Sequence, residues 1–293
     1  MKRQLLVVLA ILLALPAEAR VRKKRKPPAA GAAVRPEDDP RKRGGSPAFA
    51  KASIAFAAPA ELSQHPEGPI RIRLKVKGYA IGALKPGGPV PHVHLIVDNE
   101  PALEISDAGP VWILSGLSPG PHLLRAVLCR PWHEVVKAPK GFAMARFWIG
   151  PKLSGRAGKA AEYVAWPERR KPILTYVLPI GAPPHHLRLE REEPPQDPTE
   201  ARVPDPPPPP LPGANRPVLD FYLANARVAR RGDKIRIVLD KRELPLITEW
   251  RPQPLHRAHA GTHAVTIDLL NRKGLKVKNA VNRTDRVFTA SHR

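Results

Sequence analysis

The 293-residue sequence contains a single cysteine, Cys129, and only 5% aromatic residues. One cysteine cannot form an intrachain disulfide, so a disulfide-stapled scaffold and a cysteine-rich metal site are both excluded. The sequence also lacks a glycine-rich phosphate loop, an H-E-x-x-H motif and a G-x-S-x-G motif. The sequence shows no nucleophile next to a base and no pair of carboxylates spaced for acid–base catalysis. We therefore predict that the protein is not an enzyme.

Apolar runs long enough to cross a membrane are absent as well. The run at residues 5–15 is too short to span a bilayer. It follows Lys2 and Arg3 and precedes an Ala-x-Ala site that ends at Ala19, which is the order of regions in a cleaved secretory signal. We therefore expect residues 1–19 to be a signal peptide and the mature protein to be periplasmic or extracellular, with no transmembrane segment. No cysteine follows the cleavage site, so a lipoprotein is not expected.

Positive charge and proline are abundant. Lys and Arg number 49 against 26 Asp and Glu, which gives a formal charge of +23, and there are 38 prolines. Such a chain attracts polyanions. The most basic stretch, 22–26, lies in an arm at 20–47 that has too little apolar surface to fold. Behind a signal peptide this arm does not predict specific nucleic-acid binding, and the expected partner is an envelope polyanion or another protein. The proline run 206–210 predicts a stiff polyproline II spacer.

Short β-rich runs separated by turn residues dominate residues 48–150. The clearest run is 69–77, where Ile70, Ile72 and Leu74 alternate with basic residues, as on a strand with one buried and one solvated face. Further strands are expected at 53–57, 93–98, 102–105, 111–114, 122–128 and 142–149. Seven strands at this spacing predict an immunoglobulin-like β-sandwich.

A second β-rich region, residues 217–293, follows a linker at 151–216 and repeats the first. Strands are expected at 219–224, 235–240, 244–249, 263–270 and 287–290, and 173–178 is a candidate additional strand of this domain. The interval from Asp98 to His122 is 24 residues, and the interval from Asp240 to His263 is 23. Matched spacing predicts a duplicated domain. The predicted fold is therefore all-β, with two tandem immunoglobulin-like sandwiches, a disordered basic arm and a proline-rich linker.

The best candidate for chemistry is the pair His92 and His94. Histidines at i and i+2 on a strand lie on one face about 6.6 Å apart, so their rings can converge on one ion. A third ligand from His122, Cys129 or His133 would complete a zinc or copper site, and we take His122 first. The alternative is that His92 and His94 are exposed surface residues, because the matching positions in the repeat are lysine and arginine.

A second unusual cluster lies on a loop after a predicted strand. It comprises Arg130, Trp132, His133 and Glu134, residue types that loops often present to ligands. The competing interpretation is that Trp132 packs and pins the loop. Cys129 likewise has a simple alternative role as a small buried hydrophobic residue.

Four sequence patterns together resemble a group of exported bacterial proteins with two β-sandwich-like halves. The patterns are His92-Val93-His94 with Asp98, Leu117-Ser118-Pro119-Gly120 before His122, Arg130-Pro131-Trp132-His133-Glu134, and Leu219-Asp220-Phe221-Tyr222-Leu223-Ala224-Asn225. The resemblance covers roughly residues 90–150 and 218–290. It implies the fold and export but no activity, and the basic arm and the proline tract depart from it.

Two functions follow from the sequence. The leading hypothesis is a non-enzymatic binding or structural protein of the cell envelope that contacts an anionic polymer or a partner protein and needs no cofactor. The alternative is a periplasmic copper- or zinc-binding protein that uses His92 and His94. Neither hypothesis specifies an oligomeric state.

Overall fold

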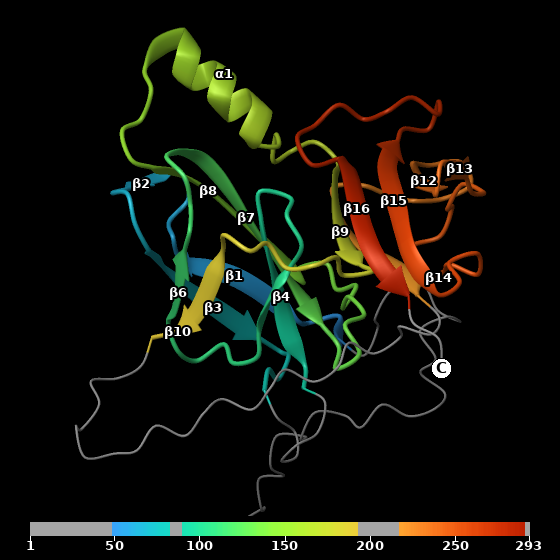
Figure 1. Ribbon diagram of the computed structural model, residues 1–293, viewed down its shortest axis with the longest axis horizontal. Coiled ribbons are helices and arrows are strands. Elements are labelled where there is room, and N and C mark those ends of the chain that lie inside the picture. The colour runs from blue at the N-terminus through green and yellow to red at the C-terminus, as the bar shows by residue number, and fades with distance from the viewer. Residues whose placement is uncertain (1–48, 83–89, 193–216, 291–293) are drawn as a thin grey trace, which may run out of the picture. The chain divides into compact units, whose positions relative to one another are not determined.

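The computed structural model describes residues 49–82, 90–192 and 217–290 (Figure 1). All of them lie within one of the two compact units into which the chain divides, Ala33–Arg293. The predicted signal peptide (1–19), the basic arm (20–47) and the proline run (206–210) lie outside the described residues.

The first sandwich pairs a four-stranded sheet with a five-stranded sheet. The four-stranded sheet has the order β1 (Ser53–Ala58), β3 (Ile70–Lys77), β6 (Trp112–Ser115) and β10 (Arg188–Arg191). The five-stranded sheet has the order β2 (Ser63–His65), β8 (Phe142–Ile149), β7 (Gly120–Cys129), β4 (His92–Val97) and β5 (Leu103–Ile105). Within these two sheets only β2 and β8 run parallel.

The second sandwich has a three-stranded and a four-stranded sheet. The three-stranded sheet has the order β14 (Gln253–Pro254), β11 (Val218–Ala224) and β9 (Ile173–Leu178). The four-stranded sheet has the order β13 (Arg242–Glu243), β12 (Lys234–Leu239), β15 (Gly261–Leu270) and β16 (Arg283–Ala290). The predicted all-β fold with tandem sandwiches is confirmed.

Apolar and polar residues alternate along the strands, and the apolar side chains fill the space between the sheets of each sandwich. In β3 the apolar side chains Ile70, Ile72 and Leu74 enter the first core, and the basic side chains between them are exposed. In β12, Ile235 and Ile237 do the same in the second core. Burying a side chain of this size contributes about 1.5–3 kcal/mol, so the period-2 pattern is what holds each strand in register.

The two sandwiches repeat the same turn. Asp98 accepts a hydrogen bond from Leu123 N and lies 2.5 Å from His122 Nδ1, and Asp240 accepts one from Ala264 N and lies 2.7 Å from His263 Nδ1. Both aspartates have positive φ, 46° and 49°. The matched spacing in the sequence therefore corresponds to a shared structural element at the hairpin between β4 and β5 and at the turn after β12.

The described part of the segment predicted as a linker, residues 151–192, is more structured than expected. It contains the one helix in the described part of the chain, α1 (Gly155–Ala165), which is too short to cross a membrane. It also supplies β9 to the second sandwich and β10 to the first, where β10 pairs with β6. β9 has the bounds of the strand expected at 173–178, whereas β10 was not expected because its four residues provide too short a pattern.

The strand predicted at 244–249 is wrong. Within that stretch only Ile247 makes a bridge, to Ile235, and the local strand is the two-residue β13. Pro245 has no backbone N–H to donate to a neighbouring strand, which is the physical reason that this segment does not extend a ladder.

The two sandwiches pack through the outward faces of two sheets. Ile96 and Cys129, on the outward face of the five-stranded sheet, join one apolar cluster with Val177 of β9 and Tyr222 of β11. Because of this contact, β4 is buried on both faces.

Candidate functional site

The outward face of β4 carries His92 and His94, and both side chains are buried with 1% of their surface exposed. The prediction that they are exposed surface residues is wrong. That prediction compared the first sandwich with the second, where the residues at the matching positions are basic. It could not take into account that the second sandwich covers this face of the first.

Three histidine rings meet at this place. His92 Nε2 lies 3.0 Å from His94 Nε2, and His94 Nε2 lies 3.0 Å from His133 Nδ1. Four-coordinate zinc with bonds of about 2.0–2.1 Å holds its ligand nitrogens roughly 3.3 Å apart. Each of these two separations is therefore close to the one that a shared ion requires.

The positions of the ring hydrogens show why these contacts between histidines are unfavourable without an ion. His92 Nδ1 lies 2.8 Å from the carbonyl of Val90, which can only accept, so Nδ1 carries the hydrogen and Nε2 carries a lone pair. His94 Nδ1 is buried and has no hydrogen-bond partner among the described residues. If the His94 hydrogen is on Nδ1, that N–H is unsatisfied and two lone pairs face each other. If it is on Nε2, that N–H either serves two acceptors or, when the His133 hydrogen is on Nδ1, faces a second N–H.

The backbone at His133 is strained in a way that supports a functional role. Arg130 N donates to Glu134 O and His133 N donates to Arg130 O, which closes a three-residue loop with His133 at φ 63°. The repeat has the same loop between Asn271 and Leu275, and Gly274 occupies the matching position at φ 79°. A side chain in this left-handed region costs about 1–2 kcal/mol, and glycine is the usual residue there.

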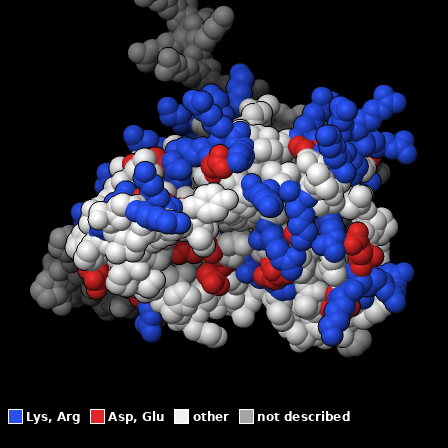
Figure 2. Space-filling view, turned by 90° about the horizontal axis from the view of Figure 1, so that it is seen from above, with Lys and Arg blue, Asp and Glu red and all other residues white. Residues whose placement is uncertain are grey.

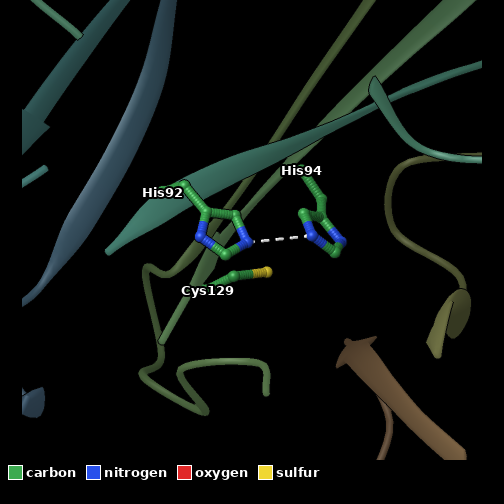
Figure 3. Close-up of side chains that lie close together, drawn as sticks. All are labelled: His92, His94 and Cys129. Atoms are coloured by element: carbon green, nitrogen blue, oxygen red, sulfur yellow. Dashed lines mark hydrogen bonds between the residues drawn. The ribbon is translucent and has the colours of Figure 1, made fainter. Parts of the chain in front are cut away.

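Cys129 and Glu104 extend the set of possible ligands. Cys129 pairs with His92 across β4 and β7, and Glu104 pairs with His94 across β4 and β5, so all four lie on one sheet face. The ligand atoms of His92, His94 and Cys129 lie within 4.8 Å of one another, as do those of His92, Glu104 and His133. Figure 3 shows the sulfur of Cys129 beside the two imidazole rings.

Burial keeps the histidines neutral. It holds the pKa of His94 well below the usual value, and the charges that His92 and His133 would carry add to this effect. Burial also lowers the pKa of His133 to about 4. Burial raises the pKa of the Cys129 thiol well above its usual value. Near neutral pH the imidazoles thus offer lone pairs, whereas the thiol would have to release a proton to bind a metal.

His122, the third ligand expected first, does not join this cluster. Side chains alternate along β7, so the odd-numbered Leu123 and Cys129 face outward, whereas His122 points to the other face of the sheet and stacks on Phe147. There it bonds to Asp98 and to the Ser118 carbonyl. Of the three candidate third ligands, the structure brings Cys129 and His133 to His92 and His94. Glu104 was missed, and only the β4–β5 register could have indicated it.

The loop cluster predicted as a binding site divides into two parts. His133 faces the histidines, whereas Arg130 lies over the rings of Phe49 and Trp132 at 5.1 and 5.5 Å. Trp132 Nε1 donates to Glu134 Oε2, and Arg130 Nε lies 3.8 Å from Glu134 Oε1. The hydrogen bond from Trp132 to Glu134 and the packing of Arg130 on the two rings agree with the alternative that Trp132 pins the loop.

The second sandwich does not repeat the imidazole cluster. Arg236, at the position of His94, donates to Asp268 and Glu243, both at 2.8 Å. The matching strand face therefore carries ion pairs in the second sandwich and histidines in the first.

No family model matches the chain, and no curated protein matches it. Among solved structures, the fibronectin(III)-like modules of Clostridium thermocellum CbhA are 10% identical, with a TM-score of 0.26, over 82% of this chain and 94% of that one. SGBP-B of the Bacteroides ovatus mixed-linkage glucan utilization locus, in complex with a mixed-linkage heptasaccharide, is 13% identical with a TM-score of 0.20, over 82% and 71% of the two chains. Similarity this low carries no information about what this chain binds.

Proposed function

We propose that this protein is a non-enzymatic metal-binding protein that holds one zinc or copper ion with His92, His94 and His133, and with Cys129 as a fourth ligand. The observation that carries the proposal is the meeting of three buried imidazoles at 3.0 Å contacts, which either leave the His94 Nδ1 hydrogen without a partner or make one N–H serve two acceptors or face a second N–H. Nitrogen and sulfur donors are the ligands that zinc and copper prefer.

Two further observations support it. His92 Nδ1 donates to the Val90 carbonyl, which fixes the tautomer whose Nε2 lone pair points at the cluster, and backbone carbonyls orient metal-bound histidines in the same way. The left-handed backbone at His133 is maintained although glycine would remove the strain, which is typical of functional positions.

The test is elemental analysis and titration with Zn²⁺ and Cu²⁺ of untagged protein and of a His133→Gly variant. We expect about one ion per wild-type chain and at least ~100-fold weaker binding by the variant, because a ligand is lost. Glycine at this position relieves strain while losing side-chain packing, so the unfolding free energy without metal should stay within ~1 kcal/mol of wild type.

The matched control removes two exposed histidines, as His185→Gln with His186→Gln, and should bind metal like wild type. A wild-type chain with no metal above trace, or a His133→Gly variant with wild-type affinity, would contradict the proposal. Loss of binding only in the control would assign the metal to the surface.

A second function, attraction to an anionic polymer outside the cell, is favoured by the exposed basic face of β3. Arg73, Lys75 and Lys77 project from alternate positions, about 7 Å apart, into solvent. Figure 2 shows one face of the molecule, on which basic side chains are spread widely and acidic ones lie in patches among them. This proposal is compatible with metal binding because the two use different surfaces.

A further inference from the structure

The loop that carries His133 is held by strand β11 of the second sandwich. Val135 N donates to Asp220 Oδ2 at 2.9 Å, and Lys137 Nζ lies 2.8 Å from Asp220 Oδ1. The hydroxyl of Tyr222 donates to the carbonyl of Ala138 at 2.6 Å. We call Asp220 and Tyr222 the β11 clamp.

The clamp explains the sequence pattern of β11. Leu219, Phe221 and Leu223 enter the core of the second sandwich, and Asp220 and Tyr222 point to the opposite face because side chains alternate along a strand. The motif singled out at residues 219–225 thus serves two purposes: one face builds its own sandwich, and the other holds a loop of the first sandwich.

The clamp residues are themselves rigidly placed. Asp220 is fully buried and Tyr222 is 2% exposed. The ring of Tyr222 stacks on Phe142 and meets Trp250 edge-on, both with ring centres 5.3 Å apart. A buried ion pair such as Lys137–Asp220 is usually no more stable than apolar side chains of the same size. Its role here is therefore better explained by the single position in which it holds the loop.

We propose that the β11 clamp positions His133 for metal binding and sets the metal affinity, so that metal binding and the docking of the two sandwiches are coupled. This inference rests on the proposed metal-binding function. His133 lies two residues before Val135, within a loop closed by the bridge between Cys129 and Val135. A strained residue persists only where its surroundings fix it firmly, and here the second sandwich adds the bonds from Asp220 and Tyr222 to those within the loop itself.

The test compares Zn²⁺ affinity, and the absorption spectrum of bound Co²⁺ as a reporter of geometry, in wild type and in Tyr222→Phe and Asp220→Asn variants. We expect roughly 10-fold to 100-fold weaker Zn²⁺ binding and a changed Co²⁺ spectrum, the usual consequence of losing groups that orient ligands. Tyr222→Phe removes only a hydroxyl and should still fold. Its result therefore decides the test if Asp220→Asn does not fold.

The matched control is Thr175→Val, which removes a hydroxyl from the neighbouring strand β9, where Thr175 Oγ1 accepts from Arg125 at 3.1 Å. It should retain wild-type affinity and spectrum. If wild type binds Zn²⁺ and Tyr222→Phe binds equally well, the clamp is overturned and metal binding stands. Equal losses in Tyr222→Phe and Thr175→Val would also overturn it, because general loosening would suffice. If wild type binds no metal, the proposed function fails first.

Discussion

His122 and His263 each present both ring nitrogens to groups that accept hydrogen bonds. His122 lies between Asp98 and the Ser118 carbonyl, and His263 lies between Asp240 and the carbonyl of His259 at 2.8 Å. A neutral imidazole has one N–H and can satisfy only one of the two acceptors, whereas an imidazolium satisfies both. The geometry alone therefore favours the protonated form at both turns.

This preference predicts a pH-dependent stability. Burial by itself would lower the pKa of His122, but its bond to Asp98 and the Asp98 charge raise it above the usual value, and the bond to Asp240 raises the pKa of His263. The folded state then binds more protons than the unfolded state above about pH 6.5, so this part of the stability is full below that pH and is lost as the pH rises through the folded pKa values.

Urea denaturation of wild type and of a His122→Gln, His263→Gln variant at about pH 6 and about pH 9 measures this contribution. The difference in unfolding free energy between the two proteins should be larger at the lower pH. A control variant, His185→Gln, alters an exposed side chain and should match wild type at both. An equal difference at the two pH values would show that these histidines contribute only packing.

At the residue scale the sequence predicted part of the candidate site. The i, i+2 spacing placed His92 and His94 on one face, and that is what the structure has. The position of His133 could not be read from spacing, because it depends on the φ angle of one loop residue. A usable signal was present in the repeat, since Gly274 at the matching loop position marks a left-handed residue.

At the scale of elements, period-2 alternation predicted strands well and failed where the chain interrupts it. β8 and β9 have the predicted bounds, 142–149 and 173–178, because each is a run of apolar and β-branched residues ended by glycine or proline. β2 and β10 were missed because three or four residues provide too short a pattern. The burial of both faces of β4 depends on contacts with a strand more than 120 residues away in the chain, which no local pattern contains.

The exposed basic face of β3 carries the prediction for the polyanion hypothesis. Replacing Arg73, Lys75 and Lys77 with Gln should weaken binding to a polyuronate and reduce the dependence of affinity on salt, because exposed charges act through screened electrostatics. The inward side chains of β3 are unchanged, so the fold should remain intact by circular dichroism.

A control with the same net charge makes this test specific. Arg230, Arg272 and Lys273 are exposed on the second sandwich, and replacing these three with Gln removes equal charge elsewhere. If both triple variants lose the same affinity, the attraction follows total charge and β3 is not a binding surface. If neither loses affinity, the described basic faces are not what a polyuronate contacts.

At the scale of the whole molecule, buried polar contacts join the sandwiches in addition to the apolar ones. Arg125 is fully buried and donates to Thr175 of β9 and to Asn99 at 2.8 Å, while Lys137 and Asp220 form a buried pair. Separating the sandwiches would expose the apolar cluster around Tyr222, remove Thr175 from Arg125 and break the buried pair of Lys137 and Asp220. Such an interface favours unfolding of both sandwiches in one step, unlike the loose contact that is usual between domains.

Calorimetry with and without Zn²⁺ tests this expectation. We predict a single transition that moves as a whole when metal is added. An ion at about 100 times its Kd adds ~2.7 kcal/mol, which for a structure of this size corresponds to a rise of about 5–10 °C. His133→Gly should show the same single transition without the rise. Two transitions, of which Zn²⁺ moves only one, would mean that the sandwiches unfold independently, and the clamp on β11 could then not transmit metal binding from the first sandwich to the second.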